Sequence, residues 1–169
     1  GRSLEGVDRD LLYAAVKAGL QNDDGRARGA YGSVYNNLTY EEVEPLLPVI
    51  YQAVIEPAPS GIMFADGIRL SGLEILAKHQ ITEGLPECIN LIAPERWGAA
   101  NRINRCLAVL RLYGEAAQSE LPRITSLEED LRIERRWSAE KIEALKLPEL
   151  IEAIEEAPVQ ELRSLHRSP

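Results

Sequence analysis

Apolar residues recur at helical spacing along most of the chain. They follow one face of the segment 8–20 and of both halves of the segments 26–55, 63–92 and 99–131. Clusters of turn-forming residues, such as those at 56–61, separate these segments. The pattern predicts an N-terminal helix followed by three helical hairpins.

Leu-Pro pairs lie in the second halves of these hairpins, at Leu47-Pro48, Leu85-Pro86 and Leu121-Pro122. Their prolines are separated by 38 and 36 residues. This period is typical of stacked helical hairpins, because a single hairpin cannot bury its apolar face without a neighbour. We therefore expect an all-α fold, an α-α superhelix of about three hairpins with flanking N- and C-terminal helices.

Local signals predict where several helices begin and end. Thr39, with Glu42 three residues later, forms a capping box that starts a new helix. Pro48 lies early in the apolar stripe that follows and predicts a kink or a restart. Gly114 predicts the end of the first helix of the third hairpin. The apolar face of residues 26–38 predicts a full first helix for the first hairpin.

The period breaks down after the third hairpin. Ser138 and Pro148 predict two short helices, and a third is expected over residues 159–167. Terminal units of solenoids are atypical because they close the core with a polar outer face. We interpret residues 138–167 as a C-terminal cap that completes one helical-repeat domain over residues 1–169. The alternative is a linker with a helix that docks a following domain.

Two stretches of the chain carry a resemblance to known repeat proteins. They are residues 61–91, with Phe64-Ala65-Asp66-Gly67-Ile68-Arg69 and Ala77-Lys78-His79, and the motif Arg96-Trp97-Gly98 followed by Arg102-Ile103. Residues 10–131 resemble the HEAT-like and armadillo-type repeats of uncharacterised bacterial proteins. The resemblance implies a right-handed α-α solenoid that serves as a binding surface or spacer, often within a larger protein. The irregular first hairpin and the long connections differ from the pattern of these repeats. These differences argue against a long, regular concave groove.

Composition and charge narrow the function classes. Hydrophobic residues make up 45% of the chain but aromatic residues only 5%, which favours a helical core of Leu, Ile, Val and Ala. The formal net charge of −8 argues against a nucleic-acid binder, which needs a dominant basic face. Residues 94–113 form a local exception, with four arginines and one glutamate.

Catalytic and metal-binding patterns are absent from the sequence. Cys88 and Cys106 lack Cys-x-x-Cys spacing and are interpreted as two free buried thiols. No Gly-x-Ser-x-Gly or phosphate-binding glycine loop occurs, so we expect no catalytic residues, no metal and no cofactor. No apolar run reaches the length of a membrane span. Because the chain begins with Gly1, we interpret it as an excised or processed piece and leave the compartment open.

The connections before the second and third hairpins hold the most distinctive residues. They contain the only Phe and one of two Trp residues, beside arginine. Equivalent connections of a solenoid project from the same edge, and aromatic residues beside arginine are typical of binding hot spots. The candidate binding edge consists of Phe64, Asp66, Arg96, Trp97, Asn101 and Arg102. The alternative is that Met63, Phe64 and Trp97 fill gaps in the core.

Arginine also recurs near the start of each hairpin. We expect Arg28, Arg69 and Arg105 to form a structural ladder with acids or carbonyls of the neighbouring unit, because a guanidinium group near a helix interface needs partners. Binding of an anionic ligand by Arg102 and Arg105 is a weaker alternative.

The sequence favours a non-catalytic scaffold that binds a protein or peptide, within a larger bacterial protein. The partner could be another domain of the same chain. The alternative function is an accessory domain that shapes the substrate cleft of a neighbouring catalytic domain.

Overall fold

The computed structural model describes residues 6–32 and 34–165, and this part of the chain is mostly helical and contains no β-strand. The all-α prediction is therefore confirmed. The helices up to the middle of the chain are α1 (Arg9–Leu20), α2 (Gly25–Gly29), α3 (Tyr40–Val43), η1 (Glu44–Leu46), α4 (Leu47–Ile55), η2 (Ile62–Phe64) and α5 (Ala65–Lys78). The later helices are η3 (Thr82–Gly84), α6 (Leu85–Asn90), α7 (Ala99–Tyr113), η4 (Gly114–Glu120), α8 (Leu121–Ile133), α9 (Ala139–Ala144) and α10 (Leu147–Glu156).

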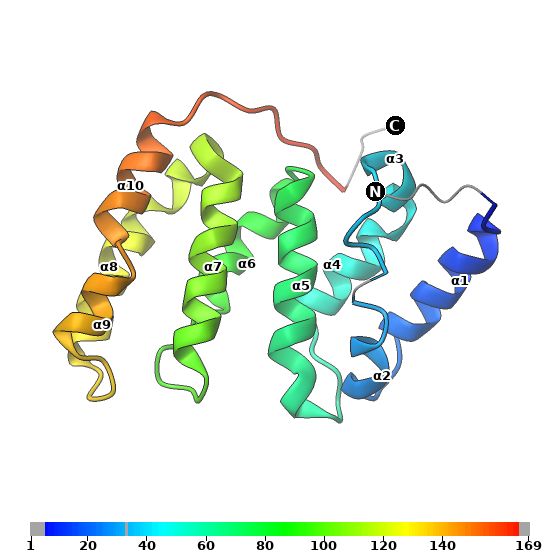
Figure 1. Cartoon of the computed structure of the whole chain (residues 1–169), viewed down its shortest axis with the longest axis horizontal. Coiled ribbons are helices and arrows are strands. Elements are labelled where there is room, and N and C mark those ends of the chain that lie inside the picture. The colour runs from blue at the N-terminus through cyan, green and yellow to red at the C-terminus, as the bar shows by residue number, and fades with distance from the viewer. Residues whose placement is uncertain (1–5, 33, 166–169) are drawn as a thin grey trace.

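The helices form two layers along the long axis of the molecule. In Figure 1, α5, α7 and α10 stand side by side, while α4, α6 and α8 lie behind them. Helix α5 packs between α4 and α7, and α7 packs in turn against α6 and α10. Leu73 and Leu76 of α5 and Ile103 and Leu110 of α7 are completely buried. One continuous apolar core therefore joins neighbouring helix pairs.

Leu-Pro pairs mark the beginning of the rear helices. The prolines of Leu47-Pro48, Leu85-Pro86 and Leu121-Pro122 all lie in the first turn of α4, α6 and α8, directly after a 3₁₀ turn. Proline lacks the backbone N–H that a continuing helix needs, but the first turn has no use for it. A fourth pair, Leu147-Pro148, also places a proline in the first turn of a helix, α10, but this helix follows Lys146, with a φ of 54°, and not a 3₁₀ turn.

Several predicted helix limits are confirmed. The Thr39 side chain accepts a hydrogen bond from the Glu42 amide, and the Glu42 carboxylate accepts one from the Thr39 amide. The predicted restart before Pro48 is the 3₁₀ turn η1. Ser138 caps α9, and α7 ends at Gly114, whose φ of 60° suits glycine.

The predicted helix over residues 26–38 is wrong beyond its first turn. Helix α2 ends at Gly29, and the described residues after it form turns up to residue 37. Gly29, Gly32 and the pair Asn36-Asn37 have low helix propensity, and this outweighs the apolar periodicity of the segment.

The predicted helix over residues 159–167 is also wrong for the part that the structure describes. Residues 157–165, here called the strap, are extended, whereas residues 166 and 167 lie outside the described residues. The strap leaves α10 and runs back over α7 towards α5 (Figure 1). Its backbone hydrogen bonds are made with residues about 80 positions earlier in the chain, which a sequence pattern does not show.

Arg163 is the main attachment point of the strap. Its backbone N–H donates to Gln80 O and its carbonyl accepts from the Thr82 N–H, both at 2.8 Å. Its guanidinium carbon lies 3.8 Å above the centre of the Tyr40 ring, and Nη1 donates to His79 O at 3.3 Å. The residues that directly follow α5 are therefore bound by an arginine from the far end of the chain.

The environment of His79 makes the stability of the fold pH-dependent. Its side chain is 7% exposed, and burial, with Lys78 and Arg163 nearby, lowers its pKa below 6.5. The unfolded chain then binds the proton more tightly, so stability is complete above about pH 6.5 and falls as the pH drops below it, by up to about 1.4 kcal/mol per pH unit. Urea unfolding between about pH 5.5 and 7.5 measures this slope. The variant His79→Phe should lose most of it, and an unchanged slope would contradict the assignment.

Two glycines of α5 predict opposite effects of the same substitution. A Cβ at position 72 would lie 2.5 Å from Val54 Cγ2 and 3.4 Å from Ile50 Cγ2, so Gly72→Ala should lower the free energy of unfolding by about 1–3 kcal/mol. A Cβ at position 67 meets nothing within 4 Å, so Gly67→Ala should raise it by about 0.5–1 kcal/mol through helix propensity. Urea denaturation of both variants checks this, and equal signs would contradict the packing of α5 on α4.

Candidate binding edge

The connections before α5 and α7 lie at the same edge of the molecule, as the sequence predicts. Helices α5 and α7 run side by side and both begin at the lower edge in Figure 1. We call residues 62–66 and 93–101 the loop edge. Its first part is anchored to the start of α2, since the Gly25 N–H donates to Ser60 O at 2.9 Å and the Ser60 N–H to Asp23 O at 3.1 Å.

Gly61 shapes the turn that leads into the loop edge. Its φ is 65°, and a Cβ there would lie 2.6 Å from Asp24 Oδ1 and 2.9 Å from Gly25 N. Only glycine fits this left-handed position without displacing the start of α2.

Arg102 organises the second part of the loop edge from inside. Its side chain is 1% exposed, and its guanidinium donates to the carbonyl oxygens of the preceding connection and to one carboxylate. The acceptors are Ile92 O at 2.8 Å, Ala93 O at 2.6 Å, Arg96 O at 3.3 Å, Trp97 O at 2.9 Å and Asp66 Oδ2 at 2.9 Å. The prediction that Arg102 contacts a partner directly is wrong, because this side chain is buried. It positions the residues that are exposed.

Asp66 connects the two parts of the loop edge. One carboxylate oxygen accepts from Arg102, and the other lies 3.4 Å from Arg96 Nη2. The Asp66 side chain is partly exposed and that of Arg96 about half exposed. Asn101, the remaining predicted residue, is exposed in the first turn of α7. One carboxylate beside the first connection thus contacts two of the predicted residues, Arg96 and Arg102.

Large apolar side chains of the loop edge face solvent. Trp97 is 91% exposed, Met63 85% and Ile62 77%, while Phe64 is 40% exposed. The alternative that Met63, Phe64 and Trp97 fill gaps in the core is therefore wrong. Single exposed apolar residues are ordinary, but several at one edge beside arginine have the composition of an interaction surface.

Two hollows flank these exposed side chains. A groove of about 410 Å³ is lined by Gly29, Gly32, Asn36, Met63, Phe64, Gly67, Ile68, Ser71 and Arg105. A smaller pocket of about 190 Å³, here called the tryptophan pocket, is lined by Pro94, Arg96, Trp97, Gly98, Ala99, Ala100, Arg136, Trp137 and Lys141. Arg136, Trp137 and Lys141 were not among the residues predicted from the sequence, although the second tryptophan beside Arg135-Arg136 is a signal of the same kind as Trp97 beside Arg96.

The arginines expected to form a ladder occupy different environments. Arg28 donates to Asn22 O and Glu56 O, and Arg69 donates to Val54 O at 2.6 Å. Arg105 instead forms an ion pair with Glu74 of α5 at 2.8 Å. Arg28 and Arg102 each donate to a carbonyl just after the preceding helix, at Asn22 and Ile92, whereas the acceptor of Arg69 lies in the last turn of α4. Because its donors are taken up, Arg102 does not support the anionic-ligand alternative.

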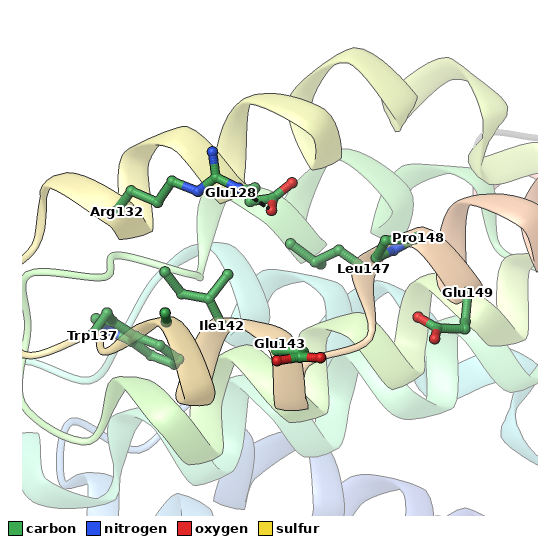
Figure 2. Close-up of a pocket in the computed structure, with 9 residues that line it drawn as sticks. Glu128, Arg132, Trp137, Ile142, Glu143, Leu147, Pro148 and Glu149 are labelled. Atoms are coloured by element: carbon green, nitrogen blue, oxygen red, sulfur yellow. Dashed lines mark hydrogen bonds and ion pairs between the residues drawn. The ribbon is translucent and has the colours of Figure 1, made fainter.

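A third cavity, of about 580 Å³, lies between α8, α9 and α10. Figure 2 shows Glu128 and Arg132 of α8 on one side, paired at 2.8 Å, and Trp137, Ile142 and Glu143 on the other. Glu149 lies at the beginning of α10. Its lining contains three glutamates and one arginine, and no Ser, Cys or His.

The two cysteines are buried and free, as predicted. Burial raises the pKa of Cys106 to about 12 and that of Cys88 well above its usual value, which makes both thiols poor nucleophiles. Within the described residues, no group of three His, Cys, Asp or Glu side chains could hold a metal ion. The same part of the chain contains no helix with the length and apolar character needed to cross a membrane.

Comparison of this chain with protein-family models, with curated proteins and with solved structures finds no match in any of the three.

Two arginines of α7 predict contrasting losses of stability. Arg102→Met removes a buried guanidinium and leaves Asp66 and four carbonyl groups without their donor, so the free energy of unfolding should fall by about 3–5 kcal/mol. Arg105→Met breaks only the half-exposed pair with Glu74 and should cost less than about 1 kcal/mol. Urea denaturation measures both values. Similar losses in the two variants would contradict the organising role of Arg102.

Proposed function

We propose that this chain is a non-catalytic binding module, a HEAT-like α-α superhelix that presents the loop edge to a protein or peptide partner. The observation that supports it most directly is the exposure of Trp97 and Met63 at an edge whose backbone is held from inside. Tryptophan and arginine are the residues most enriched in binding hot spots, and Trp97 lies beside Arg96.

The hydrogen bonds of Arg102 support the proposal because they order the loop edge in advance. A connection whose carbonyl groups are bound to a buried guanidinium loses little conformational freedom when a partner arrives. The hydrogen bonds between the connection before α5 and the start of α2 have the same effect on Met63 and Phe64. Aromatic side chains on an ordered connection lose less conformational freedom on binding than they would on a mobile loop, and this favours a role of the loop edge in binding.

The packing of the helices supports the superhelical part of the proposal. Front helices α5, α7 and α10 each pack against a rear helix, and Leu-Pro pairs begin the rear helices α4, α6 and α8. Arrays of this kind serve as binding surfaces because stacked helix pairs form one extended surface. The partner is a separate protein or another domain of the same chain.

The proposal is tested by placing a photo-crosslinking amino acid at Asn101, which is exposed and adjacent to the loop edge. A partner crosslinked from the native source is identified, and its affinity is then measured for Trp97→Ala, Phe64→Ala and Leu11→Ala. The first two should weaken binding about tenfold or more, with Trp97→Ala changing stability by less than about 0.5 kcal/mol.

Leu11→Ala is the matched control. It removes an apolar side chain that is 69% exposed on α1, away from the loop edge, and should leave the affinity unchanged. Unfolding of Trp97→Ala, or equal affinities for all three variants, would contradict the proposal.

A further inference from the structure

The tryptophan pocket contains both tryptophans of the chain and three cationic residues. It lies between the start of α7 and the segment that leads into α9. Trp137 is 8% exposed, and so forms a fixed wall, whereas Trp97 is 91% exposed. The cations Arg96, Arg136 and Lys141 come from both sides of the pocket.

The positive charge of this pocket is not neutralised by its own lining. None of its nine lining residues is acidic, although the chain carries a net charge of −8. Arg136 forms no ion pair within the described part of the chain, and Lys141 Nζ donates to a neutral acceptor, Arg136 O, at 3.2 Å. Among the residues that the structure describes, Arg96 is the one cation of the pocket in an ion pair, at 3.4 Å from Asp66. The pocket therefore attracts an anion.

The beginning of α7 adds to this attraction. The residue before the helix is Gly98, with a φ of 77°. Because glycine has no side chain, it does not cap the amide groups of the first turn. Ala99 and Ala100 of this turn line the pocket. Helix N-termini carry partial positive charge, which reinforces the three cationic side chains.

The neighbouring cavity has the opposite character and thereby restricts where an anionic segment can lie. Glu128, Glu143 and Glu149 line it against a single cation, Arg132, which is already paired with Glu128. Trp137 lines both hollows. An acidic segment is therefore attracted to the tryptophan pocket and repelled from the cavity beside it.

We infer that the tryptophan pocket receives a carboxylate side chain of an acidic segment in the partner protein. This inference rests on the proposed function and specifies the chemistry of the partner. A hollow of about 190 Å³ has room for one such side chain rather than for a folded surface. Its carboxylate pairs with Arg136 and Lys141, and its aliphatic stem, with the next residue of the segment, lies on the exposed indole of Trp97.

The chain offers an intrinsic probe for this site, since its only two tryptophans both line the pocket. Tryptophan fluorescence is titrated with deca-glutamate, deca-lysine, free glutamate and inorganic phosphate. Deca-glutamate should change the emission in a saturable manner and bind more weakly as salt is added, because the attraction is between exposed charges. Deca-lysine should have no effect. Free glutamate and phosphate, at the same concentration of anionic groups, should have at least about tenfold weaker effects.

Charge reversal at two adjacent positions distinguishes binding in the tryptophan pocket from a general electrostatic attraction to the protein surface. Arg136→Glu should weaken the binding of deca-glutamate about tenfold, since it replaces an attraction by a repulsion. Arg135→Glu makes the same charge change one residue away, at an exposed position outside the pocket lining, and should weaken binding less than about twofold. Circular dichroism verifies that both variants are folded.

Any of the following outcomes would overturn the inference. No response to deca-glutamate, an equal response to deca-lysine, or equal losses in Arg135→Glu and Arg136→Glu would each show that the pocket does not select an acidic segment. A response to phosphate as strong as that to deca-glutamate would show a small-anion site instead. If the crosslinked partner still depends on Trp97 while deca-glutamate fails to bind, the proposed function stands and only the acidic segment is wrong.

Discussion

The burial of one guanidinium group determines how the third helix pair meets the second. Arg102 is charged and almost inaccessible, so its donors must find acceptors inside the fold. It finds them in the connection from α6 to α7 and in Asp66 of α5, and these bonds give the connection its course. The exposure of Trp97 depends on this course, since the Trp97 carbonyl points inward to Arg102 while its side chain faces solvent. Arg102 thus contributes both to the stability of the fold and to the conformation of the loop edge.

Different interactions order the two edges of the molecule. At the loop edge, hydrogen bonds of buried side chains order short connections between adjacent helices. At the opposite edge, the strap returns from α10 and binds the end of α5 through Arg163, which lies over Tyr40. The strap thereby links the end of α10 to the end of α5 across α7.

Charge is distributed unevenly in this acidic chain. Arg96, Arg136 and Lys141 gather around two tryptophans, whereas the adjacent cavity between α8, α9 and α10 carries more carboxylates than cations. Short-range electrostatics therefore distinguish two neighbouring hollows that share Trp137. Net charge alone, which argues against nucleic-acid binding, conceals this local contrast.

The amino-acid sequence by itself determined the features that depend on local backbone chemistry. The Thr39 capping box, the restart at Pro48 and the end of α7 at Gly114 follow from residues within one turn of each other. It also indicated that Phe64, Asp66, Arg96 and Trp97 gather at one edge. Tertiary structure alone decided that Arg102 is buried, that Trp97 is exposed, that Trp137 and Arg136 join the site and that the strap is extended. The position of Arg102 against α5 and the course of the strap depend on partners 36 and 83 residues away, Asp66 for Arg102 and Gln80 for Arg163, and local periodicity contains no information about such distant contacts.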